Sequence, residues 1–72
     1  MSCQLHDIRI GESALILAVD LGEKERLRLE SMGILPGVEV SILAKGTGPI
    51  IVVAGDSRVM IEHEIASKII VI

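Results

Sequence analysis

Residues 32–43, MGILPGVEVSIL, carry the strongest local signals for the fold. Leu35, Pro36 and Gly37 predict a type II turn, because proline suits the second position of that turn and glycine the third, where φ is positive. In residues 38–42, apolar and polar side chains then alternate, which is the period-two pattern of a strand with one face on the core. The stretch therefore predicts a tight turn that leads directly into a β-strand.

The charged residues ahead of this turn predict one helix. Asp20 and Glu23 have the spacing of a capping box, which satisfies backbone N–H groups at the start of a helix. The sequence EKERLRLESM, residues 23–32, suits a helix that ends at Gly33, because glycine readily adopts the left-handed conformation that follows a helix.

Within this helix, Leu27 is expected to point away from the core. At 100° per residue it lies about 200° from Leu29 and about 140° from Met32, and these two share one face. Two explanations stay open: the N-terminal segment folds over Leu27, or Leu27 and the neighbouring Arg28 contact a partner. The mixed charges around them are otherwise typical of a solvated helix face.

Short aliphatic runs elsewhere predict the remaining strands, and an apolar pair near the N-terminus predicts a short helical turn over the core. These segments are residues 14–19 (ALILAV), 50–54 (IIVVA), 58–61 (RVMI) and 69–72 (IIVI) for the strands, and Leu5 with Ile8 for the turn. We therefore predict one mainly β domain over residues 1–72. Its expected architecture is a small, partly open, SH3-like barrel of about five strands with one inserted helix.

Composition excludes several functions of small barrels. The 72 residues are 50% hydrophobic but contain no Phe, Tyr or Trp, so the core must be aliphatic. Without aromatic rings the chain lacks a groove for proline-rich peptides and a platform for stacked bases. The net charge of −3 also opposes a phosphate backbone, so we expect no nucleic-acid partner.

The chain also shows no signal for export or for membrane insertion. Cys3 is the single cysteine, so no intramolecular disulfide can form. The first residues lack the basic start and apolar stretch of a secretory signal. The longest unbroken apolar run, residues 14–19, is far shorter than the ~20 residues that cross a bilayer. We expect a cytoplasmic protein without direct membrane insertion.

Chemistry-bearing residues are few. The sequence has no GxxxxGK, HExxH or CxxC motif and no nucleophile with an evident base, so we expect no enzyme activity. Cys3 and His6 have a C-x-x-H spacing that would place thiolate and imidazole on one side of a helical turn, a weak candidate site for iron or zinc. His63 lies between two glutamates and is expected in a solvated polar loop.

The ordered set of these features resembles the FeoA family, the small cytosolic components of bacterial ferrous iron transport, over essentially the whole chain. The resemblance depends on Leu5, Ile8, Gly11, Ile16, Arg26, Arg28, the MGILPG motif at 32–37 with Gly33, Pro36 and Gly37, then Pro49, Ile50, Val52, Gly55, Arg58, Val59, Ile61, Ala66, Ile69 and Val71.

Membership would imply a non-enzymatic accessory protein of the FeoB transporter, whose cytosolic part is a guanine-nucleotide-binding domain. It implies no required cofactor, with iron or zinc as the transition metal to test. A related barrel occurs in the C-terminal domain of iron-dependent repressors, but a chain with one helix has no room for a DNA-recognition helix. The alternatives are a transition-metal-binding protein and a self-associating domain.

Departures from the family pattern predict a second apolar surface. Aliphatic residues stand where polar ones are commoner in the family, at Leu15, Leu17, Leu27, Leu43, Ile51, Val53 and Ile70. Strand alternation directs most of them away from the core. We expect Leu15, Leu17, Ile51 and Val53 to form the contact with a partner or with a second copy of the chain.

Overall fold

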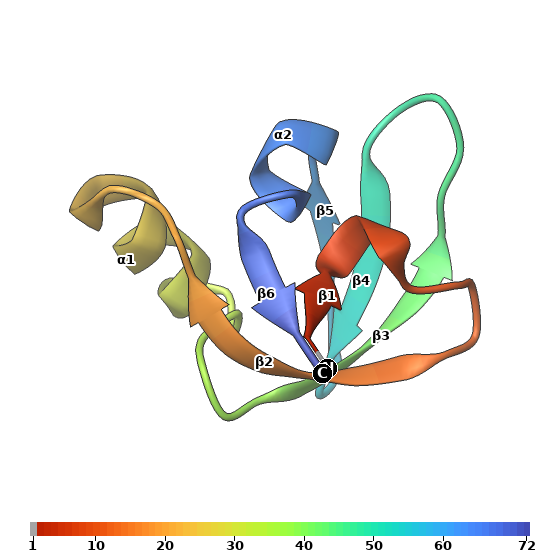
Figure 1. Cartoon of the computed structure of the whole chain (residues 1–72), viewed down its shortest axis with the longest axis horizontal. Helices are drawn as coiled ribbons and strands as arrows, with labels where there is room; N and C mark the ends of the chain where they lie inside the picture. Colours follow the sequence, from red (N-terminus) through yellow and green to blue (C-terminus); the bar gives the residue numbers. More distant parts are fainter. Residues whose placement is uncertain (1) are drawn as a thin grey trace.

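A computed structural model describes residues 2–72 of the chain as a curved, antiparallel sheet around an aliphatic core (Figure 1). In chain order the elements are β1 (Cys3–Gln4), the short 3₁₀-helix η1 (Leu5–Asp7), β2 (Ser13–Val19), α1 (Glu23–Ser31), β3 (Glu39–Ala44), β4 (Ile50–Ala54), β5 (Ser57–Ile61), α2 (His63–Ala66) and β6 (Ile69–Val71). The strand order in the sheet is β1-β6-β2-β3-β4-β5. The predicted mainly β, partly open architecture is confirmed.

The sheet has six strands where the sequence predicted about five, because the N-terminus forms a short strand of its own. Cys3 pairs with Val71 and Gln4 with Ile70, so β1 lies along β6. The helical turn starts after this pairing, at Leu5, whose side chain is fully buried. The predicted apolar turn over the core is therefore present, and Leu5 is part of the core.

A second short helix, α2, stands where a polar loop was expected before the last strand. Its backbone forms two helical hydrogen bonds of 2.9 Å. The N–H of Ala66 donates to the carbonyl oxygen of Glu62, and the N–H of Ser67 to that of His63. The turn carries Ala66 into the core, where it is fully buried. Burial of this side chain explains why the polar segment coils.

Helix α1 begins two residues later than the predicted capping box required. Its N-cap is Gly22, and no side chain caps it. The predicted capping by Asp20 is wrong, because the N–H of Asp20 still belongs to the sheet region and donates to the carbonyl oxygen of Lys68 at 2.8 Å. The predicted end of the helix is confirmed, as Gly33 follows the C-cap with φ of +87°.

The core is filled from every strand of the sheet except β1, and from η1, α1 and α2. Its members are Leu5, Ala14, Ile16, Leu29, Ile34, Val40, Ile42, Ile50, Val52, Ala54, Val59, Ile61, Ala66, Ile69 and Val71. No polar or charged residue is buried among residues 2–72. None of the helices in this described part of the chain has the length and apolarity of a membrane span.

The predicted turn lies between α1 and β3 and is hydrogen-bonded to β2. Gly37 has φ of +91°, and the N–H of Val38 donates to the carbonyl oxygen of Leu35 at 3.3 Å, as a β-turn requires. The N–H of Gly37 donates to the carbonyl oxygen of Ile16 at 2.8 Å, and the N–H of Ile16 to that of Val38 at 2.9 Å. The turn thereby fixes the position of β3 relative to β2.

Replacing Gly37 by valine is expected to lower the free energy of unfolding by about 1 to 3 kcal/mol, because a β-branched residue is strained at positive φ. No atom outside its chain neighbours lies within 4 Å of the position that a Cβ would take, so the cost comes from the backbone alone. Urea denaturation followed by circular dichroism measures it.

Gly46→Val is the matched control, because Gly46 has equally open surroundings and no positive φ. Equal stability of the Gly37 variant and the control would contradict the role assigned to the turn.

Candidate functional site

The outer face of the sheet carries aliphatic side chains that the core does not use. In β2, Leu15 and Leu17 are 40% and 44% exposed, whereas Ile16 between them is 1% exposed. In β4, the half-buried Ile51 and Val53 alternate with fully buried residues. The strand faces predicted from the sequence are therefore confirmed.

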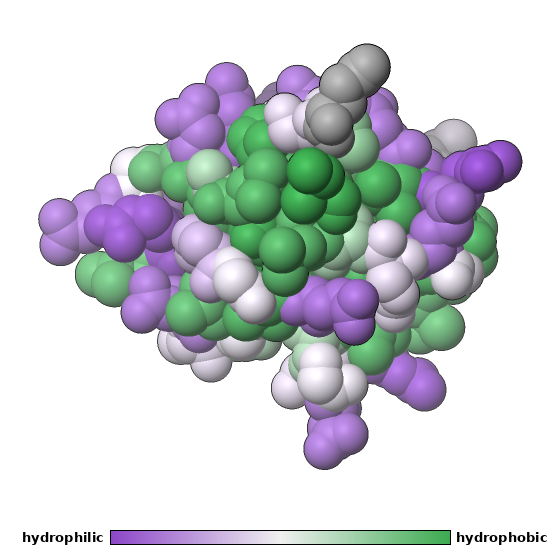
Figure 2. Space-filling model, turned by 60° about the horizontal axis from the view of Figure 1, so that its bottom comes forward, coloured by the Kyte–Doolittle hydropathy of each residue, from purple (hydrophilic) through white to green (hydrophobic). Residues whose placement is uncertain are grey.

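Four of these side chains gather at the end of the sheet where the chain terminates, and we call Leu15, Leu17, Ile70 and Ile72 the terminal patch. The backbones of Leu15 and Ile72 exchange two hydrogen bonds of 2.9 Å, and directly opposed residues of antiparallel strands point to the same face. Leu17 lies at the irregularity where β2 pairs with Ile70. Figure 2 shows apolar side chains in the middle of this face, with hydrophilic residues around them.

A second group lies on the β3–β4–β5 side, and we call Leu43, Ile51, Val53 and Met60 the hairpin patch. Ile51 is directly opposite Met60, and Leu43 lies at the irregularity where β3 pairs with the end of β4. Met60 is 69% exposed. Met60 was not among the residues predicted for the apolar surface, although its alternation with Val59 and Ile61 would have assigned it to the outer face.

Polar residues of β3 separate the two patches. Glu39 is opposite Leu15, while Ser41 is opposite Ser13 on one side and Val53 on the other. The structure therefore does not bring the four predicted contact residues of β2 and β4 together. Leu15 and Leu17 belong to one patch, and Ile51 and Val53 to another.

Helix α1 leaves Leu27 exposed, at 49%, beside the exposed Arg28, while Leu29 on the opposite face is buried. The interpretation that the N-terminal segment covers Leu27 is wrong, because η1 packs against α2 and β6 instead.

A cleft of about 250 Å³ separates α1 from β5 and α2. Its apolar lining includes Leu29 and Met32 on the helix side and Met60, Ile61 and Ile65 on the other. Three charged residues, Glu25, Arg28 and Glu62, also border it. The lining of the cleft is therefore mixed, with five apolar and three charged residues.

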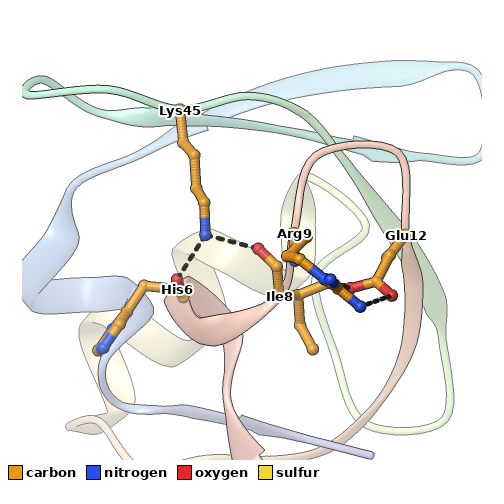
Figure 3. Close-up of polar contacts among 5 residues, drawn as sticks. All are labelled: His6, Ile8, Arg9, Glu12 and Lys45. Carbon is orange, nitrogen blue, oxygen red and sulfur yellow. Dashed lines mark hydrogen bonds and ion pairs between the residues drawn. The ribbon is translucent and has the colours of Figure 1, made fainter.

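Lys45 fastens the N-terminal segment to the barrel (Figure 3). Its Nζ donates hydrogen bonds to the carbonyl oxygens of His6 at 3.0 Å and Ile8 at 2.7 Å, in a partly buried position. Such bonds from a charged donor are stronger than neutral ones. The sequence offers no signal for this contact, because its acceptors are backbone atoms far away along the chain.

The loop after η1 has its own ion pair, in which Arg9 Nε lies 3.3 Å from Glu12 Oε1 (Figure 3). The pKa of Glu12 lies below its usual value. The main cause is hydrogen bonding from the Arg9 side chain, and the hydrogen bond from the Arg9 backbone N–H and the positive charge of Arg9 act in the same direction. Both side chains are exposed, so this pair shapes the loop and contributes little to stability.

The spacing of the candidate metal residues Cys3 and His6 predicted that they share a helical turn. This prediction is wrong, because Cys3 lies in the extended strand β1 and His6 in η1. Among residues 2–72 there is no group of three or more His, Cys, Asp or Glu side chains that could hold a metal ion. A structural zinc site uses about four ligands, so the residues described here do not form one.

The fold does bring His63 of α2 beside His6, with ring centroids 6.3 Å apart. The Nδ1 atom of His6 is buried without a hydrogen-bond partner in the described part of the chain, and its Nε2 lies 3.4 Å from Asp7. His63 Nε2 lies 3.3 Å from the carbonyl oxygen of Gly46. This pair could not be predicted from the sequence, because the two histidines stand near opposite ends of the chain.

Comparison with known proteins identifies relatives over almost the whole chain. The family model described as FeoA domain matches residues 3–72. A crystal structure of an iron uptake regulatory protein, FeoA, is 29% identical with a TM-score of 0.88, over 100% of this chain and 96% of that one. The FeoA of Stenotrophomonas maltophilia complexed with zinc, a procaryotic SH3 domain protein, is 28% identical with a TM-score of 0.81, over 96% and 88% of the two chains. The SH3-like fold is thereby confirmed.

The same barrel occurs in a regulator of transcription. A manganese-dependent transcriptional repressor has a TM-score of 0.84 and 24% identity, over 99% of this chain and 41% of the repressor. At that identity the likeness shows the shared fold alone. No curated protein sequence matches the chain significantly.

Replacing Lys45 by methionine is expected to lower the free energy of unfolding by about 1.5 to 3 kcal/mol, because the carbonyl oxygens of His6 and Ile8 lose a charged donor in a partly buried position. Faster amide hydrogen exchange, concentrated in β1 and η1, would show that the N-terminal segment has loosened. Lys68→Met is the matched control, since Lys68 is exposed. Identical exchange in the two variants would contradict the fastening role.

Proposed function

Because this chain belongs to the FeoA family, we propose that it is a non-enzymatic accessory protein of bacterial ferrous iron uptake that binds the cytosolic domain of a FeoB-like transporter. Its family ties it to ferrous iron transport. The proposal gives the chain no reaction of its own: it acts by binding. Binding to a cytosolic domain requires that the chain act in the cytoplasm, which is therefore part of the proposal.

The terminal patch is the observation that carries this proposal. Leu15, Leu17 and Ile72 are 40%, 44% and 55% exposed, and half-buried Ile70 lies beside them. An exposed group of aliphatic side chains with polar neighbours such as Glu39 has the layout of a protein–protein contact. Each large aliphatic side chain that a partner covers contributes about 1.5 to 3 kcal/mol before the cost of association.

Helix α1 offers a second contact for the same partner. Leu27 and Arg28 stand exposed next to each other, which is the pairing of an apolar anchor with a charged neighbour that is common at interfaces. Leu27 lies on a different element from the terminal patch, so substitutions can separate the two surfaces. Ile51 and Val53 of the hairpin patch form a third candidate surface.

The test is a calorimetric titration of this chain into the soluble cytosolic domain of a FeoB-like transporter, with and without ferrous iron. We expect Leu15→Lys with Leu17→Lys to weaken binding at least tenfold, because two aliphatic contacts are lost and a charge is desolvated in place of each. Leu27→Lys and Arg28→Glu are expected to weaken it less.

Ser13→Lys is the control for an added lysine charge on the same strand, because Ser13 lies exposed on β2 two residues before Leu15 and outside the terminal patch. Circular dichroism must show that all variants are folded. A wild-type chain that does not bind the transporter domain in either condition would refute the partner assignment, and equal affinity of the double variant and the control would refute the terminal patch.

Transition-metal binding is the second candidate function, and the proximity of His6 and His63 is the observation that favours it. Neutral imidazole nitrogen is a good ligand for zinc and iron. The zinc in the Stenotrophomonas maltophilia relative is consistent with this candidate. Two imidazoles with solvent would hold an ion less firmly than a full set of protein ligands.

If the chain binds metal, zinc titrated into the wild type should bind at low micromolar concentration, and Cys3→Ser with His6→Ala should abolish binding without unfolding the chain. Neither side chain belongs to the buried core, so the fold should survive. His63→Ala distinguishes the two proposed pairs of ligands: it removes binding only if the histidine pair is the site. Absence of zinc binding by the wild type would exclude this candidate.

A further inference from the structure

Strand β5 ends the sheet, because it pairs with β4 and with no other strand of the described residues 2–72. A two-residue turn joins β4 to β5, with Ala54 opposite Ser57 at its base. In such hairpins the residues at the base form a hydrogen-bonded pair, and bonded and non-bonded pairs then alternate along the strands. The backbone groups of Arg58 and Met60 therefore point away from β4, to the open edge.

The open edge is accessible where it borders the cleft beside α1. Three consecutive residues, Met60, Ile61 and Glu62, line that cleft. Met60 and Ile61 are the last residues of β5, and Glu62, the N-cap of α2, continues the strand in an extended conformation, so the cleft lies at this end of the edge. Within residues 2–72, no backbone hydrogen bond from another element reaches Arg58 or Met60. The edge can therefore accept another strand.

We propose that β5 is a self-association edge, at which two copies of this chain pair their β5 strands antiparallel with Met60 opposite Met60. The occupant is a second copy because the outward residues of β5 are complementary to themselves. Arg58 and Glu62 form no ion pair within the described part of the chain, so both charges are available to a partner.

Three registers place Arg58 or Met60 of one β5 strand opposite Arg58 or Met60 of the other. The charges of the neighbouring residues favour the register with Met60 opposite Met60. Arg58 opposite Arg58 places like charges together. Arg58 opposite Met60 places Asp56 opposite Glu62, which is also repulsive. Met60 opposite Met60 places Arg58 of each copy opposite Glu62 of the other, so two ion pairs flank the centre of the new strand pair.

Apolar contacts reinforce the same register. Met60 is 69% exposed and would lie against its counterpart, next to Ile51 of each hairpin patch. The Arg58 side chain of the second copy would approach Glu62, and Glu25 of α1 lines the same cleft. Because one strand edge is a small interface, the dimer is expected to be weak, with dissociation constants of tens to hundreds of micromolar.

Charge reversal tests the proposal by sedimentation velocity from low to several hundred micromolar protein. The wild type should shift from monomer to dimer, and Arg58→Glu or Glu62→Arg alone should stay monomeric, since each opposes like charges. Mixing the two single variants should restore a dimer, because every opposed pair is then complementary. The chain with both changes should also dimerise, because the charges at positions 58 and 62 are then both reversed and still attract each other.

Two controls isolate the edge. Lys24→Glu, on exposed α1, changes the net charge as Arg58→Glu does and should leave dimerisation unchanged. Leu15→Lys with Leu17→Lys alters the terminal patch and should also have no effect. Amide exchange at Arg58 and Met60 should slow as the protein concentration rises, because these N–H groups become bonded in the dimer.

A wild type that stays monomeric throughout the concentration range overturns the proposal and leaves the edge for a different chain. A dimer that survives both single reversals, or that is lost in the Leu15 and Leu17 variant, overturns it in favour of another surface. Failure of the mixed variants to associate, with both folded by circular dichroism, rules out the Met60-centred register.

Discussion

The absence of aromatic side chains is the constraint on which the rest of the structure depends. No single large ring can fill the barrel, so small aliphatic groups must reach its centre from all sides. Leu5 of η1, Leu29 of α1 and Ala66 of α2 therefore complete a core begun by the strands, and each is buried. Lys45 holds the N-terminal segment that follows Leu5, and α2 carries Ala66 into the core.

The same composition leaves apolar residues on the outside. Half of the chain is hydrophobic, but the interior of so small a domain accommodates only part of that set. Alternation in β2 and β4 sends the remainder to the outer face, and the polar residues of β3 divide it into the terminal and hairpin patches. The surface available for binding is thus a direct consequence of how the core is built.

The sequence predicted what depends on neighbouring residues and failed where distant residues decide. Alternation gave the correct strand faces, and Pro36 with Gly37 gave the turn, because both signals are local. The pairing of β1 with β6, the contact of Lys45 and the approach of His6 to His63 join opposite parts of the chain. The division of the predicted apolar surface was missed for the same reason, since it follows from strand order. Asp20 has the right spacing for a cap but is held by the sheet.

The two binding surfaces that we propose differ in position and in physical character, so one can act without blocking the other. The terminal patch lies on β2 and β6, whereas the open edge belongs to β5, with β3 and β4 between them. An aliphatic patch gains affinity from covered area and tolerates several orientations of its partner. A strand edge imposes direction and register through its backbone groups, and its charges admit one alignment. A pair of chains joined at β5 would therefore keep both terminal patches exposed, and would present two copies of the patch to a transporter domain.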